Sequence, residues 1–154
     1  MLLQTPNEFR ASLPPEGRLL GLDLGDTTIG LALSDGRRNI ASPLETIERK
    51  KLSKDLEKLA AIIAKHSVCG LVVGYPLNMD GSQGPRTQFT RTFVSHASKA
   101  IHLPMLLWDE RLSTMAVERM MLDADMTRQR RAVLVDKLAA SYMLQGFLDN
   151  VTAA

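Results

Sequence analysis

The chain has 154 residues and a formal net charge of +2 at pH 7. This length suffices for one well-buried core and is too short for two ordinary domains. No stretch approaches the ~20 apolar residues of a membrane-spanning helix, and the small net charge argues against a generic polyanion-binding protein. The only cysteine, Cys69, lies in an apolar run, so no internal disulfide can form and a reducing, cytoplasmic location is expected.

Residues 1–17 lack the basic start and apolar core of a signal peptide, and Pro14 and Pro15 would interrupt such a core. We expect these residues to form a flexible N-terminal arm. A single domain over residues 18–150 is expected to follow the arm.

Three apolar segments after this arm predict consecutive β-strands at residues 18–24, 29–34 and 40–47. The short connection between the first two suits a hairpin. A helix is expected from about Ser53, which we take as its N-cap, because apolar side chains then recur at helical spacing. Residues 69–74 form a short apolar run that is typical of a central strand covered on both faces.

The Gly/Pro-rich loop of residues 75–85 leads into another predicted helix, with Pro85 in its first turn. Residues 104–108 predict a fifth strand. Two helices, over about residues 113–122 and 127–148, are expected to end the chain. This order predicts an α/β fold with a mixed five-stranded sheet, in which three antiparallel strands precede parallel strands and helices cover both faces.

Two acidic residues lie where the sequence is otherwise apolar. Asp23 stands in the strand segment LLGLDLG, where a buried carboxylate is costly unless it is paired or binds a metal. The alternative is a structural aspartate that caps the turn at Gly25. Asp136 shares the apolar face of the last helix with Ala140. The alternative to a functional role is a structural one, in which Asp136 forms an ion pair with a neighbouring basic residue. We favour a functional role, because two misplaced carboxylates need the same explanation.

A third acidic feature, Asp109-Glu110, directly follows the predicted strand at residues 104–108. Functional sites in α/β sheets usually lie at the carboxyl ends of strands. Taken alone, however, this feature is equally explained by a turn in which an acidic side chain pairs with Arg111. Together, the three features predict a site of hard oxygen ligands for Mg²⁺ or Mn²⁺. Such ions can activate water and stabilise the leaving oxygen in phosphodiester cleavage.

Local clusters of arginine form candidate phosphate-binding surfaces. Arg128, Arg130 and Arg131 lie close together in the sequence, and Arg86 and Arg91 flank another segment. Clusters of this kind bind phosphates without an extreme isoelectric point. For any single arginine, a solvated helix face is the simpler interpretation.

Four blocks of sequence match, in order, the pattern of one protein family. They are GLDLG with IGLALSD (residues 21–25 and 29–35), GYPLNMDGS (74–82), DERLST (109–114), and VDKLAA with LQ (135–140 and 144–145). Each block is modest alone, whereas four in register are highly specific. The chain therefore resembles the YqgF/RuvX family of Holliday junction resolvase-like, pre-16S ribosomal RNA nucleases, and the resemblance covers nearly the whole chain.

The resemblance implies a ribonuclease H-like fold and a nuclease with a divalent ion at its catalytic site. The acidic residues that match the family's ligands are Asp23, Glu110 and Asp136, and Asp109 is the rival of Glu110. The resemblance also implies that the protein trims the 5′ end of precursor 16S rRNA during ribosome biogenesis. Nucleic acid is the expected partner, with ribosomal particles as further candidates and either a monomer or a homodimer as the assembly.

Two points concern how the nucleic acid would be held. Members of the family commonly carry a basic residue in the first hairpin, where this chain has Asp26-Thr27-Thr28, so no phosphate contact is implied for that turn. We expect contacts to nucleic acid from five arginines instead: Arg86, Arg111, Arg128, Arg130 and Arg131.

Three other functions remain open on the sequence alone. The fold would also serve a Holliday junction resolvase that acts on branched DNA, or a non-catalytic RNA-binding module of ribosome assembly. The segment Asp-Leu-Gly-Asp-Thr-Thr resembles the first phosphate-binding turn of the sugar kinase, actin and heat-shock ATPase superfamily. Those proteins close two such domains around ATP, and this chain is long enough for only one.

Overall fold

The computed structural model describes residues 1–75, 80, 83–109 and 128–153, with side chains in the last helix described over residues 138–150. The elements in chain order are β1 (Leu2–Leu3), α1 (Pro6–Ala11), β2 (Arg18–Leu24), β3 (Thr28–Ser34), β4 (Ala41–Glu48), α2 (Leu52–His66), β5 (Val68–Tyr75), α3 (Pro85–Ala100), β6 (Met105–Asp109) and α5 (Arg128–Ala153). The helix predicted at residues 113–122 lies outside the described residues. No helix in the described part of the chain is long and apolar enough to cross a membrane.

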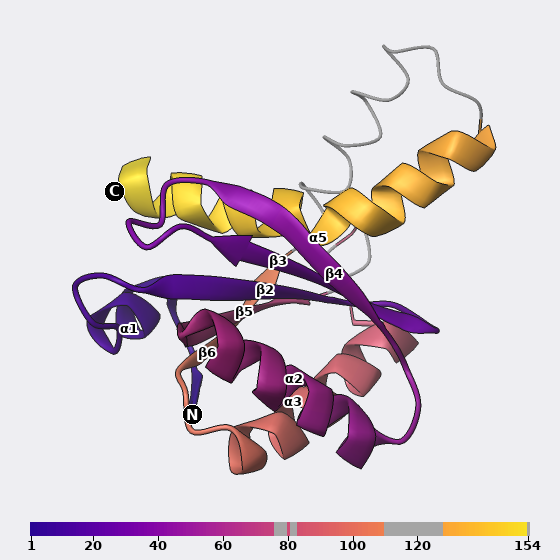
Figure 1. Cartoon of the computed structure of the whole chain (residues 1–154), viewed down its shortest axis with the longest axis horizontal. Coiled ribbons are helices and arrows are strands. Elements are labelled where there is room, and N and C mark those ends of the chain that lie inside the picture. The colour runs from indigo at the N-terminus through magenta and orange to yellow at the C-terminus, as the bar shows by residue number, and fades with distance from the viewer. Residues whose placement is uncertain (76–79, 81–82, 110–127, 154) are drawn as a thin grey trace.

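A mixed sheet of six strands, in the order β1-β6-β5-β2-β3-β4, forms the centre of the molecule. β3 runs antiparallel to both β2 and β4, whereas β5 is parallel to β2 and to β6. The strands β2, β4, β5 and β6 therefore all end at one edge of the sheet, here named the carboxyl edge. α2 and α3 cover one face of the sheet and α5 covers the other (Figure 1). The predicted α/β fold is confirmed, with one strand more than expected.

The additional strand comes from the segment that we expected to be a flexible arm. β1 pairs in parallel with β6, and the Met105 backbone N–H donates to the Met1 carbonyl at 2.8 Å. In α1, which Thr5 caps through its side chain, Phe9 is fully buried and its ring lies 5.6 Å from that of Phe147. The structure thus places these residues in the fold. The sequence pattern missed this because the apolar side chains of the segment are few and their partners lie far along the chain.

Alternation along β2 divides the core into two layers. Leu20 and Leu22 are buried against α2 and α3, whereas Leu19 belongs to the cluster beneath α5. Because successive strand side chains point to opposite faces, Gly21 and Asp23 share the α5 face with Leu19. On the α5 face, a glycine and an acid therefore follow Leu19 toward the carboxyl end of β2.

The start of α2 differs slightly from the expectation at Ser53. The N-cap is Lys51, and no side chain caps the helix there. Instead, the buried carboxylate of Asp55 accepts hydrogen bonds from the Lys50 backbone N–H, the shorter at 3.0 Å. A carboxylate in the first turn of the helix, where the backbone dipole favours negative charge, therefore replaces the predicted serine cap. By contrast, α3 begins at Pro85 as predicted.

Candidate active site

Asp23 occupies the last part of the β2 pleat before the hairpin. Its residue partner across the antiparallel ladder is Gly30, which has no side chain to cover the carboxylate from that direction. Asp23 is half-buried, and within the described part of the chain its carboxylate has neither a hydrogen-bond nor an ion-pair partner. Burying a carboxylate costs free energy unless another group binds it, so Asp23 remains a candidate ligand for a cation.

The crossing of α5 over β2 explains why Gly21 is a glycine. A Cβ at Gly21 would lie 3.0 Å from the Cβ of Leu144 and 3.4 Å from the Ala140 carbonyl oxygen. The backbone of α5 therefore approaches β2 two residues before Asp23. A larger side chain at this position would push the helix away from the strand.

The direction of α5 follows from its contacts at the other end of the sheet. The Gln145 side chain accepts a hydrogen bond from the Ala41 N–H at 2.8 Å and donates one to the Asn39 carbonyl at 3.0 Å. Ala41 begins β4, so this part of α5 lies at the amino-terminal end of β2. In Figure 1 the earlier turns of α5 (orange) leave the sheet on the side where β2 and β4 end. The Asp136 side chain lies outside the described part, so its predicted meeting with Asp23 is untested.

β6 brings the third acidic feature to the same edge. Met105 and Leu107 pack in the layer of α2 and α3, whereas Leu106 and Trp108 pack in the layer of α5, where the Trp108 ring lies 5.6 Å from that of Phe147. By this alternation, the side chain of Asp109 is expected on the face of the sheet opposite to Asp23. Glu110 and Arg111 lie outside the described residues, as do the side chains of Arg128, Arg130 and Arg131.

No group of three or more histidine, cysteine, aspartate or glutamate side chains among the described residues could hold a metal ion. Two of the three predicted ligands, Glu110 and Asp136, contribute no described side chain to that search. The predicted grouping of Asp23, Glu110 and Asp136 thus stays a prediction.

Arginines hold the hairpin turn that follows Asp23. Arg86, a predicted nucleic-acid contact in the first turn of α3, donates to the Leu24 carbonyl at 3.0 Å. Arg49 donates to the carbonyls of Gly25 and Asp26 at 2.6 and 2.9 Å, and its guanidinium lies 3.8 Å from the centre of the Phe89 ring. Arg49 was not among the predicted site residues. Its position just after the third predicted strand, level with the first hairpin, is the signal that could have indicated it.

An antiparallel hairpin followed by parallel strands, helices on both faces and an acid at the end of the first long strand define a ribonuclease H-like fold. A solved structure, that of T. thermophilus RuvC in complex with a Holliday junction substrate, shares this fold. The match has a TM-score of 0.51 and 13% identity, and covers 88% of this chain and 96% of that chain.

The chain belongs to the RuvX family, whose model is described as Holliday junction resolvase and matches residues 17–150. A relative from Ruegeria pomeroyi is 51% identical over 151 residues, which is 98% of both chains. One from Paramagnetospirillum magneticum is 53% identical over 150 residues, which is 97% of both chains. Both are named "Putative pre-16S rRNA nuclease". The resemblance that the four sequence blocks indicated is confirmed, and the chain is a hydrolase of phosphodiester bonds.

Proposed function

We propose that this protein is a metal-dependent nuclease that matures the 5′ end of precursor 16S rRNA, with Asp23, Glu110 and Asp136 as its catalytic residues and metal ligands. The observation that carries the proposal is the position of Asp23 and its lack of a partner among the described residues. Its carboxylate is half-buried at the carboxyl edge of the sheet. The names of the full-length relatives supply the substrate.

The donor chemistry fits a hard divalent cation. Carboxylate oxygens are the ligands that Mg²⁺ and Mn²⁺ prefer, and repulsion between converging carboxylates is relieved when a cation binds. α5 crosses β2 at Gly21, on the face that also carries Asp23, and the proposal takes Asp136 from an earlier turn of this helix. A bound ion would supply electrostatic stabilisation of the charge that develops on the phosphate. The acidic residues of this chain would hold that ion at the carboxyl end of β2.

The faces of the sheet support Glu110 over Asp109 as the third ligand. Asp109 continues the series of Met105 and Leu107, whose side chains pack away from α5. The side chain of Asp109 is therefore expected on the face opposite to Asp23, and the match of the four sequence blocks to the family implies Glu110 instead. The proposed ligand set accordingly contains Glu110.

Cleavage by wild-type protein and by an Asp23→Asn variant tests the proposal, on a 5′-extended 16S precursor with Mn²⁺ or with EDTA. The amide keeps the volume of the side chain but loses the charge, so we expect at least a ~100-fold loss of rate, or about 2.7 kcal/mol of transition-state stabilisation. Asp26→Asn is the matched control, because Asp26 is an exposed aspartate on the same hairpin. Metal at ~100 times its dissociation constant should also stabilise the wild-type chain by about 2.7 kcal/mol and leave the Asp23→Asn variant unchanged.

Cleavage by a folded Asp23→Asn protein at the wild-type rate would exclude Asp23 from catalysis. A melting temperature that is the same in Mn²⁺ and EDTA would exclude the metal site. The family description favours a second candidate, a resolvase that acts on branched DNA. A four-way DNA junction in a parallel reaction distinguishes the two substrates, since we expect cleavage of the RNA.

A further inference from the structure

Three arginines follow the carboxyl edge of the sheet on the side of α3. Arg49 comes directly after β4, Arg86 holds the end of β2 at the Leu24 carbonyl, and Arg91 donates through Nε to the Tyr75 hydroxyl at 2.6 Å, at the end of β5. The sheet order places β5 beside β2 and β4 beyond β3, so the three guanidinium groups are spread along one edge.

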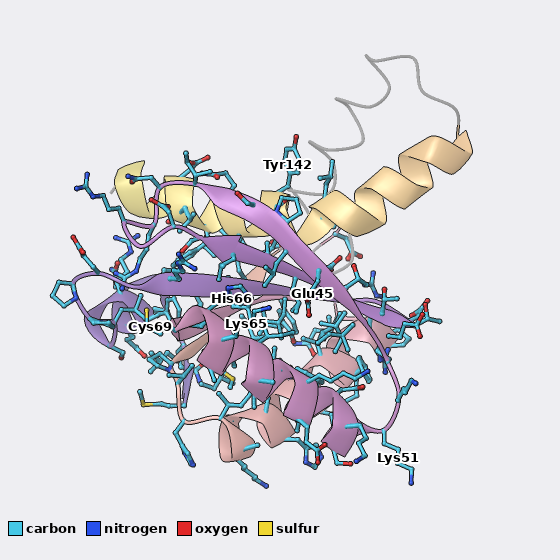
Figure 2. The ribbon with its side chains drawn as sticks, in the orientation of Figure 1. Glu45, Lys51, Lys65, His66, Cys69 and Tyr142 are labelled. Atoms are coloured by element: carbon cyan, nitrogen blue, oxygen red, sulfur yellow. The ribbon has the colours of Figure 1, made fainter. Side chains whose placement is uncertain are left out.

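None of the three guanidinium groups is neutralised by a carboxylate in the described part of the chain. Their hydrogen-bond partners are backbone carbonyls and a phenol, and the ion pair found among the described residues, between Lys54 and Glu57, lies elsewhere on α2. Lys50 and Lys51 add two cations directly after Arg49, and Figure 2 shows Lys51 at the start of α2, on the side where β4 ends. Asp26 and Glu48 lie at the same edge, but neither forms an ion pair with these arginines among the described residues. Each of the three guanidinium groups therefore keeps a positive charge that no ion pair in this part of the chain offsets.

Each arginine keeps donors available. A guanidinium has five N–H groups in a fixed plane. The hydrogen bonds of Arg49 use Nη1, that of Arg86 uses Nη2 and that of Arg91 uses Nε. The Phe89 ring centre lies 3.8 Å from Cζ of Arg49, against the face of its guanidinium. The Tyr75 ring centre lies 5.7 Å from Cζ of Arg91. The close contact with Phe89 restricts the plane of the Arg49 guanidinium, so its remaining donors are organised before a ligand arrives.

We propose that Arg49, Arg86 and Arg91 form a binding surface for the phosphate groups of a nucleic-acid backbone next to the cleavage site. This inference rests on the proposed nuclease function and adds a place for the strand beyond the scissile bond. A planar guanidinium that already holds one carbonyl can donate a pair of parallel hydrogen bonds to a phosphate. Phosphate contacts position a strand without reading its sequence. Phe89 packs in the layer of α2 and α3, so the surface lies on the face opposite to Asp23. It therefore suits a single strand that crosses the carboxyl edge at the end of β2 on its way to Asp23.

The salt dependence of binding tests this surface. A labelled single-stranded RNA is titrated by fluorescence anisotropy with the full Asp23→Asn chain in EDTA, so that neither cleavage nor divalent ions interfere. Each phosphate contact with single-stranded nucleic acid contributes about −0.7 to the slope of log affinity against log salt. Replacing all three arginines with glutamine should flatten the slope by about 2. Glutamine retains an N–H donor for the carbonyls, and a DNA strand of the same sequence should show the same change.

Matched variants separate charge from structure. Arg49→Lys keeps the charge, so the slope of log affinity against log salt should stay at its wild-type value. Arg49→Gln removes the charge and should flatten this slope by about 0.7. Lys99→Gln removes an exposed charge from the last turn of α3, away from the edge, and should leave the slope unchanged. Arg86→Gln and Arg91→Gln are also measured alone, because both residues are exposed and their loss is well tolerated by a fold.

An unchanged slope in the folded triple variant would overturn the surface, whether or not the wild-type chain cuts RNA. A flattened slope supports it, and it does so independently of catalysis because every measurement uses an inactive chain. Failure of the proposed nuclease function is instead read from the wild-type cleavage assay. The two proposals therefore fail in different experiments.

Discussion

The two ends of β2 use similar residues for different purposes. At the amino-terminal end, Arg38 donates from Nε to the Gly17 carbonyl at 2.9 Å and from Nη2 to the Pro14 carbonyl at 2.7 Å. At the carboxyl end, Arg49 and Arg86 hold the carbonyls of the hairpin in the same way. Both ends are thus pinned by guanidinium groups that bind backbone oxygens.

The ends differ in what surrounds these arginines. At the amino-terminal end the buried Ser34 hydroxyl accepts from the Leu19 N–H and donates to the Asp35 carbonyl. The carboxylate of Asp35 in turn accepts from two backbone N–H groups. At the carboxyl end, Asp23 has no partner among the described residues. Polar groups that satisfy one another stabilise the fold, whereas polar groups without a partner are available to a ligand, which is why we assign the site to the carboxyl end.

The largest effect on stability should come from the amino-terminal end. Ser34 is 2% exposed, and its hydroxyl accepts the Leu19 N–H at 2.8 Å. Ser34→Ala leaves that buried N–H without an acceptor, which should cost about 1–3 kcal/mol of unfolding free energy. Urea denaturation measures this loss. Asp23→Asn, measured beside it without metal, should cost nothing, because no described partner is lost; a Ser34→Ala protein as stable as wild type would contradict the comparison.

A smaller effect is expected from Arg38, which tests the arginines of the two ends against each other. Arg38→Gln gives up hydrogen bonds of a charged donor on a half-buried side chain, and solvent screening reduces the cost to about 1 kcal/mol. The same variant should bind single-stranded RNA with the wild-type salt slope, since Arg38 lies at the end away from Asp23. A flatter slope in Arg38→Gln would mean that charge anywhere on the protein governs binding.

Much of this contrast could be predicted from the sequence. The runs of apolar residues predicted β2, β3, β5 and β6 to within one or two positions, and the acid inside LLGLDLG singled out Asp23 as a candidate ligand. Arg49 and Arg38 could not be found in this way, because their partners are backbone carbonyls, which have no sequence signature. β1 and Phe9 were missed for a related reason, since their partners, β6 and Phe147, lie far along the chain.

The smallest expected effect is a pH dependence of the unfolding free energy that comes from Asp35. The backbone N–H of Ile40, with a further contribution from that of Asn39, holds the pKa of the Asp35 carboxyl below its usual range, although burial opposes this. A carboxylate with a lowered pKa in the folded chain stabilises the fold at every pH above its unfolded pKa of about 3.9. That contribution is lost as the pH falls through the folded pKa, because both states are then protonated.

Asp35→Asn removes the titration and keeps an oxygen that can accept the same two hydrogen bonds. The wild-type chain should therefore be more stable than the variant by a constant amount between pH 7 and about 5, and this difference should narrow below about pH 4. Urea denaturation of both proteins across this range measures the difference. The carboxyl edge provides the control, since Asp26→Asn lies in a turn whose side-chain carboxylate accepts no hydrogen bond among the described residues and should show no such narrowing. A difference for Asp35→Asn that stays constant down to about pH 3 would mean that the two N–H groups do not distinguish the charged carboxylate from a neutral amide.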